Sequence, residues 1–97
     1  MLGSPIYDIT GVTVLGDHGL HLVFADGSEG DVDIARLIDF RGVFKALRDV
    51  REFQRVYVDP EAGTIVWPNG ADLDPLVLYS EATNRSIESL LASTAVR

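Results

Sequence analysis

The chain of 97 residues contains no cysteine, only two histidines and a single tryptophan. The absence of cysteine excludes disulfides, thiolate nucleophiles and Cys-ligated zinc sites, and it fits a reducing cytoplasm. No apolar run approaches the roughly 20 residues that a membrane-spanning helix requires, so no membrane partner is expected. These absences favour a small cytoplasmic domain.

Positive charge is also scarce, because 8 Lys and Arg residues face 15 Asp and Glu residues and the net charge is -7. The cations are sorted along the chain. The segment 36–55 holds six of them and three acids, which gives it a net charge of +3, whereas the remainder has two cations and twelve acids. The six are Arg36, Arg41, Lys45, Arg48, Arg51 and Arg55. A phosphate backbone favours a positive footprint, so nucleic acid is expected to bind only weakly or indirectly.

Hydrophobic patterning predicts an α+β fold, namely a small, mostly antiparallel sheet of two hairpins with short helices packed on one side. Leu20, Leu22 and Phe24 alternate with polar or smaller positions, as in a half-buried strand. Asp26-Gly27 predicts a type I′ turn, in which both residues adopt positive φ. The predicted strands are residues 7–15, 20–25, 29–32, 54–59 and 64–67.

Three helices are predicted between or after these strands. Asp33 is the expected N-cap of a helix over 34–38, and Asp74-Pro75 has the pattern of another helix start. A helix over 42–50 is expected to bury one side and expose its cations. The expected buried residues are Val43, Phe44, Leu47 and Val50.

Residues 1–82 are predicted to form a single domain, with 83–97 as a short C-terminal helix or frayed tail. Ile87, Leu90 and Leu91 form an apolar stripe in that tail, which could support a homodimer.

Several blocks of sequence carry a resemblance to a known family, and the most specific is the string Trp67-Pro68-Asn69-Gly70-Ala71-Asp72. The others are residues 22–27, 30–33, 42–44, 47–49, 53, 63–66, 73–75 and 78–79. Together they resemble domain-of-unknown-function family twenty-four forty-two, a group of small bacterial proteins.

The resemblance implies a small α+β domain and no established activity. Some members of that family are fused to a helix-turn-helix DNA-binding domain. Others are encoded beside a second small protein, which implies a toxin–antitoxin-like pair. Residues 80–97 are too few for a helix-turn-helix domain, so contact with DNA is expected through a partner.

Four acids are candidate metal ligands, because Asp31 and Asp33 could meet Asp72 and Asp74 and bind Mg²⁺ or Ca²⁺ in a small metal-dependent enzyme. The favoured interpretation is local: Asp33 and Asp74 cap helices, and the other two lie on turns. No metal or other cofactor is therefore predicted.

Catalytic residues are not indicated. His18 lies in a predicted turn and His21 on a predicted strand, and spacing places no third ligand or partner beside them. Solvent-exposed histidines are the expected outcome, and no nucleophile-elbow, P-loop or dinucleotide motif is present.

Two surfaces are candidates for binding a partner. Trp67, with Tyr79 and Tyr57, could form an aromatic patch, although an aromatic residue on a strand more often packs in the core. Arg41, Lys45 and Arg48 recur at near-helical spacing and could form a basic face.

The alternative for that basic face is a solvated surface, partly neutralised by the i,i+4 pairs Lys45–Asp49 and Arg48–Glu52. The leading functional hypothesis is a non-catalytic interaction or regulatory module of a bacterial cytoplasm, the antitoxin-like member of a two-protein system. Its acidic body predicts a small basic partner protein. Weak nucleic-acid binding through Arg41, Lys45 and Arg48 remains an alternative.

Overall fold

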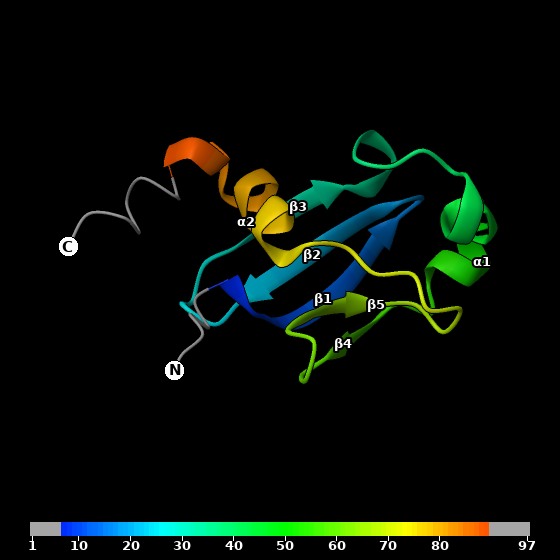
Figure 1. Cartoon of the computed structure of the whole chain (residues 1–97), viewed down its shortest axis with the longest axis horizontal. Coiled ribbons are helices and arrows are strands. Elements are labelled where there is room, and N and C mark those ends of the chain that lie inside the picture. The colour runs from blue at the N-terminus through cyan, green and yellow to red at the C-terminus, as the bar shows by residue number, and fades with distance from the viewer. Residues whose placement is uncertain (1–6, 90–97) are drawn as a thin grey trace.

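Two antiparallel sheets organise the chain in the computed structural model, which describes residues 7–89 (Figure 1). One sheet has the order β1-β2-β3, and the other is the hairpin β4-β5. The strands are β1 (Ile9–Gly16), β2 (Gly19–Phe24), β3 (Glu29–Asp33), β4 (Tyr57–Asp59) and β5 (Thr64–Val66). The predicted α+β fold of hairpins and short helices is confirmed, with the strands divided between two sheets.

Strand β2 lies at the centre of the first sheet and supplies much of the core. Its alternation places Leu20, Leu22 and Phe24 on the buried face, as the sequence predicts. The ring of Phe24 packs edge-to-face on Tyr79 of the last helix, with 4.9 Å between the ring centroids. The last helix therefore packs on the buried face of the sheet near Phe24.

The hairpin between β2 and β3 forms as predicted but with a different turn. The N–H of Phe24 donates to the carbonyl of Ser28 at 2.8 Å, and the N–H of Gly27 donates to the carbonyl of Phe24 at 2.9 Å. Within residues 24–28, only Gly27 has a positive φ, of 91°. The connection is therefore a three-residue loop ending in a left-handed glycine, and the predicted two-residue type I′ turn is wrong.

Short helices join the strands. They are the 3₁₀ helices η2 (Ile34–Arg36) and η3 (Gly42–Arg48) and the α-helices α1 (Val50–Phe53) and α2 (Pro75–Thr83). Asp33 and Asp74 are N-caps, as predicted, because their carboxylates accept from the main-chain N–H groups of Ala35 at 3.1 Å and Leu76 at 2.8 Å.

The predicted continuous helix over 42–50 is wrong. The 3₁₀ helix η3 ends at Arg48, Asp49 has extended backbone angles, and α1 starts at Val50. The Asp49 carboxylate accepts from the N–H of Arg51 at 2.9 Å, so it caps α1 instead of continuing η3. Because a 3₁₀ helix has three residues per turn, its apolar residues do not share one face, and Val43 is 46% exposed.

The predicted strand 54–59 begins later than expected. The N–H groups of Arg55 and Val56 donate to the carbonyls of Glu52 and Phe53, so these residues complete the turn after α1. Strand β4 starts at Tyr57.

The outer elements attach to the first sheet at three places. The N–H of Ile9 donates to the carbonyl of Gly63 at 3.0 Å, which places the β4-β5 hairpin beside β1. Helix α2 packs on β3, where a Cβ on Gly30 would lie 2.1 Å from the carbonyl oxygen of Ala82. The ring Nε2–H of His18 donates to the carbonyl of Leu47 at 2.7 Å, which holds η3 against the β1–β2 turn.

Within residues 7–89, none of the helices combines the length and the apolar character that a membrane crossing requires. Ile87 lies in a helical segment over 87–89. Leu90 and Leu91, the other members of the predicted apolar stripe, lie outside the described residues.

Candidate functional site

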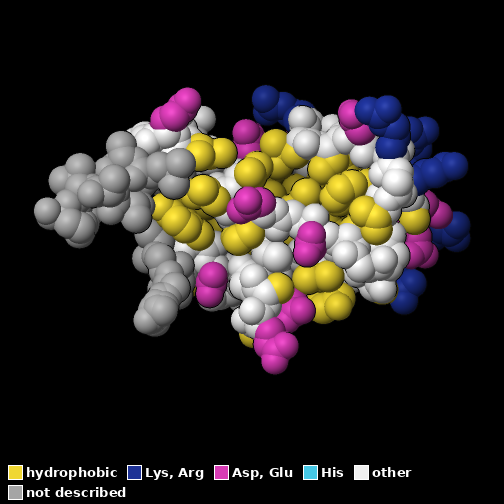
Figure 2. All heavy atoms as spheres, viewed as in Figure 1, with side chains coloured by type: hydrophobic (Ala, Val, Ile, Leu, Met, Phe, Trp, Pro, Cys, Tyr) yellow, Lys and Arg dark blue, Asp and Glu magenta, His cyan; other side chains and the backbone are white. Residues whose placement is uncertain are grey.

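The six cations of segment 36–55 define the basic end of the molecule. Figure 2 shows Lys and Arg side chains gathered toward the end where Figure 1 places α1, while Asp and Glu side chains are spread over the rest of that face. The segment runs from η2 through η3 to α1. The folded chain therefore converts the charge sorting of the sequence into a charge separation in space.

Half of these cations are paired with acids of the same segment. Arg41 lies 2.8 Å from Asp39, Arg51 lies 3.4 Å from Asp49, and Arg55 lies 3.4 Å from Glu52. These pairs are exposed, so each contributes little to stability.

The predicted pairs Lys45–Asp49 and Arg48–Glu52 do not form, because the helix breaks at Asp49. Among residues 7–89, neither Lys45 nor Arg48 makes an ion pair within 4.0 Å. The guanidinium of Arg48 lies over the ring of Phe40, 5.8 Å from the ring centroid. Two of the three predicted binding cations are therefore available to an external anion, and the third, Arg41, is paired with Asp39.

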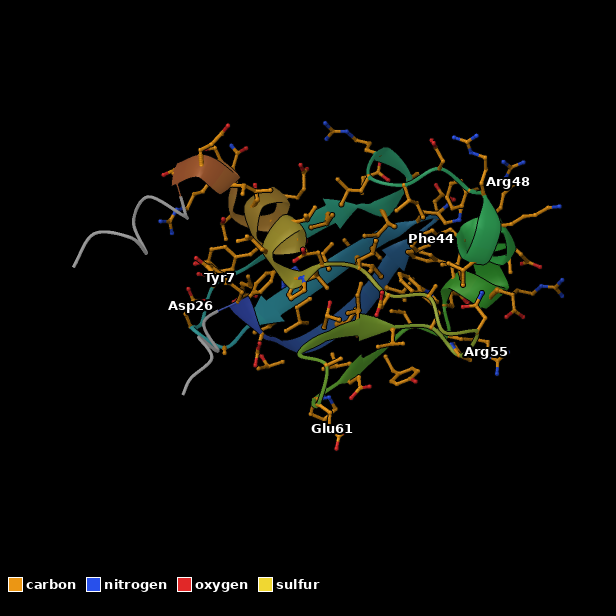
Figure 3. The ribbon with its side chains drawn as sticks, in the orientation of Figure 1. Tyr7, Asp26, Phe44, Arg48, Arg55 and Glu61 are labelled. Atoms are coloured by element: carbon orange, nitrogen blue, oxygen red, sulfur yellow. The ribbon has the colours of Figure 1, made fainter. Side chains whose placement is uncertain are left out.

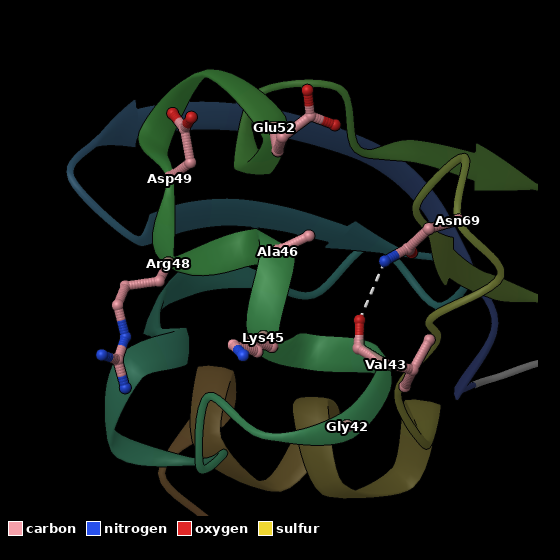
Figure 4. Close-up of a pocket in the computed structure, with 8 residues that line it drawn as sticks. All are labelled: Gly42, Val43, Lys45, Ala46, Arg48, Asp49, Glu52 and Asn69. Carbon is pink, nitrogen blue, oxygen red and sulfur yellow. Dashed lines mark hydrogen bonds between the residues drawn. The ribbon is translucent and has the colours of Figure 1, made fainter.

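A shallow groove of about 740 Å³ lies on this surface (Figure 4). The amide of Asn69 donates to the carbonyl of Val43 at 2.8 Å and so joins the 68–70 turn to η3. Residues of η3, of the start of α1 and of the turn line the groove. They are Gly42, Val43, Lys45, Ala46, Arg48, Asp49, Glu52 and Asn69.

The carboxylate of Asp49 is already engaged at the edge of this groove. The hydrogen bond from the main-chain N–H of Arg51, followed by that from the Arg51 side chain, lowers the pKa of Asp49. Asp49 is therefore ionised at neutral pH, and its carboxylate caps the start of α1.

The predicted aromatic patch does not assemble. Trp67 is 1% exposed and donates its indole N–H to the carbonyl of Phe53 at 2.9 Å, while Tyr79 is 2% exposed. The Tyr79 hydroxyl donates to Asp26 at 2.5 Å, and this bond lowers the pKa of Asp26. Only Tyr57 is at the surface, 47% exposed. Trp67 and Tyr79 are thus core residues in this structure.

Figure 3 places the Asp26 turn and the basic end far apart. Tyr7 and Asp26 lie toward one end of the first sheet, and Arg48, Phe44 and Arg55 lie toward the other. The ring of Tyr7 packs on Tyr79 with 5.1 Å between centroids. The tyrosine cluster therefore belongs to a different part of the molecule from the groove.

The four candidate metal ligands have separate local roles. Asp33 and Asp74 cap η2 and α2, Asp31 bonds to His21, and Asp72 forms an isolated bridge with Val66. Across residues 7–89, no three His, Cys, Asp or Glu side chains are grouped so that they could hold a metal ion.

His21 has a defined environment that the sequence did not predict. Its Nδ1 lies 2.7 Å from a carboxylate oxygen of Asp31, and its Nε2 lies 2.8 Å from one of Glu29. Hydrogen bonds to Asp31 and then to Glu29 raise the pKa of His21. His18 instead lies between the rings of Phe40 and Phe53, with centroids 4.9 Å and 4.8 Å away. Neither histidine has the arrangement of a general base with a nucleophile beside it.

Comparison of the chain with curated proteins gives no match, and comparison with solved structures gives none either. The model of the family described as "Protein of unknown function (DUF2442)" matches residues 9–84. This match includes both sheets, η3 and α2, together with every residue that lines the groove. The chain belongs to this family.

Proposed function

We propose that the chain is a non-catalytic interaction module that binds an acidic surface of a partner protein through the basic end. The observation that carries this proposal is the pair Lys45 and Arg48, which line one groove without an ion pair to any residue in 7–89. Two cations left without counter-charges, in a segment of net charge +3, attract an acidic partner.

The acidic body supports a basic partner less specifically, because turns and helix starts account for several of its carboxylates, which stay ionised. The carboxylates of Asp26, Asp33, Asp59 and Asp74 each accept a hydrogen bond from a nearby main-chain N–H. Turns and helix starts select Asp for this bond whatever the partner. The small basic partner that the sequence suggested is therefore replaced in this proposal by an acidic one.

The setting of the proposal is a bacterial cytoplasm, in which the chain acts as the regulatory, antitoxin-like member of a two-protein system. The resemblance to the family supports this setting, because it implies that a second small protein is encoded beside some relatives. The absence of a metal-binding group among residues 7–89 favours binding over metal-dependent catalysis.

The test is co-purification of tagged full-length chain from its native cytoplasm, with and without nuclease. The variant is Lys45→Glu with Arg48→Glu, and the matched control is Arg85→Glu, because Arg85 is also exposed and lies beyond α2. An acidic protein should copurify with the wild type and with Arg85→Glu after nuclease treatment, and should be lost with the double variant. Equal capture by the double variant would contradict the proposal.

Direct nucleic-acid binding is the second candidate, since the same two cations could contact phosphates. It predicts retention on DNA or RNA at low salt and a steep loss of affinity as salt increases. In the co-purification it predicts that captured proteins disappear on nuclease treatment. The two candidates therefore give opposite results for nuclease treatment of the wild-type sample.

A further inference from the structure

The groove on the basic end is asymmetric in charge. Figure 4 shows Lys45 and Arg48 to one side of Ala46 and Asp49 and Glu52 to the other. The two acids are paired with Arg51 and Arg55, which lie outside the groove lining. One side of the groove therefore presents positive charge that is unpaired, and the other presents negative charge that is already paired.

Two apolar residues also line the groove. The side chain of Val43 is 46% exposed, although its main-chain carbonyl is fixed by Asn69, and Ala46 is also exposed. In the view of Figure 2, hydrophobic side chains extend toward the basic end. A fixed apolar surface beside unpaired cations has the chemistry of a binding hot spot with a charged rim.

We propose that this groove binds an acidic peptide segment of the partner, with one apolar side chain of the segment on Val43 and Ala46 and its carboxylates on Lys45 and Arg48. This inference rests on the proposed function, and it names the chemistry of the part of the partner that is recognised. The carboxylates lie on the Lys45 side only, because the cations there lack acidic partners, whereas Asp49 and Glu52 on the other side are acids that already have cationic partners.

The same asymmetry disfavours a nucleic acid in the groove. A strand that follows a groove needs cations along the path of its phosphates, usually with aromatic rings on which the bases stack. Here two carboxylates lie along one edge, and the lining includes no aromatic residue. The nearby ring of Phe40 is covered by Arg48. An acidic peptide avoids the negative edge because its charges can be confined to one side.

The experiment follows main-chain amide NMR signals of the full chain during titration with a short synthetic peptide of Glu and Gly residues around one central Leu. A matched peptide has Ser in place of Leu, and a third probe is a single-stranded oligonucleotide of equal charge. We expect signals of Val43, Lys45, Ala46, Arg48 and Asn69 to shift with the Leu peptide. Replacing the Leu should weaken binding about tenfold, as expected for loss of one buried apolar side chain.

Two protein variants separate the two kinds of contact. Lys45→Glu with Arg48→Glu should abolish binding of both peptides, while Val43→Ser should make the Leu and Ser peptides bind equally. Arg85→Glu should bind as the wild type does. Signals away from the substituted residues should keep their positions in every variant, because the altered side chains are exposed.

Three outcomes would overturn the inference: no shift with the Leu peptide, shifts outside the groove, or tighter binding of the oligonucleotide at these same residues. If the peptide fails while capture of the acidic partner still depends on Lys45 and Arg48, the groove inference fails and the proposed function stands. If the peptide binds while partner capture does not depend on these cations, the proposed function fails.

Discussion

The indole N–H of Trp67 donates to the main-chain carbonyl of Phe53 at 2.9 Å, inside the core. The two rings also pack, with 5.6 Å between their centroids. Trp67 follows β5 directly, and Phe53 is the last residue of α1. This single side chain therefore joins the second sheet to the segment that carries the basic end.

Trp67→Phe should destabilise the fold by roughly 1–3 kcal/mol, because the Phe53 carbonyl keeps only the bond from the Val56 N–H and the smaller ring leaves a cavity. Urea unfolding followed by circular dichroism measures the change. Tyr57→Phe is the control, since Tyr57 is exposed and makes no comparable contact. A loss of less than about 0.5 kcal/mol would show that the bond contributes little.

Asn69→Ala should cost about 1 kcal/mol, because it removes the bond from the Asn69 amide to the Val43 carbonyl and the bond that Ala71 N–H donates to Asn69. The loss also frees η3 from the 68–70 turn. NMR should show larger signal changes at Val43 than on β2. Unchanged signals at Val43 would mean that the turn does not position the groove.

Local chemistry explains which parts of the fold the sequence predicts correctly. The alternation of Leu20, Leu22 and Phe24 and the caps at Asp33 and Asp74 depend on neighbouring residues alone. The break at Asp49 was missed because the apolar spacing suits one continuous helix. Asp49 and Glu52 nevertheless have the spacing of a capping box, and this pattern in the sequence indicates a new helix start at Val50.

The His21 contacts depend on the register between β2 and β3. The predicted two-residue turn gives the wrong register. A two-residue turn at Asp26-Gly27 places Asp31 opposite Leu22. The three-residue loop that forms shifts the pairing by one position, and His21 then faces Asp31. The groove could not be predicted either, since it needs the contact between Asn69 and Val43 across 26 positions of sequence. The cations themselves could be predicted from charge sorting.

Gly30→Ala should destabilise the fold by roughly 1–3 kcal/mol, because the added Cβ would meet the carbonyl of Ala82 and push α2 away from β3. Gly11→Ala is a matched control on β1, where the new Cβ would make ordinary contacts at 3.5 Å with Val23. Thermal unfolding of both variants measures the difference. Equal melting temperatures would contradict the close approach of α2.

The two bonds of His21 require a protonated ring. Carboxylates only accept hydrogen bonds, so Nδ1 and Nε2 must both donate to satisfy Asp31 and Glu29 together. This requirement agrees with the raised pKa of His21, whose ordinary value is 6.5. Protonation therefore holds the edge strand β3 to β2 on the exposed face of the sheet.

Because the pKa of His21 is higher in the folded chain than in the unfolded chain, its stabilising contribution is full below about pH 6.5 and is lost as pH rises through the folded value. We expect the urea midpoint of the wild type to fall as pH rises from about 6 to about 8. His21→Gln removes this group and should flatten the fall. A separate NMR titration of the His21 ring gives the folded pKa directly. A folded pKa of His21 at or below 6.5 would contradict the ion pairs that His21 makes with Asp31 and Glu29. Identical slopes of the urea midpoint against pH for the two proteins would contradict them as well.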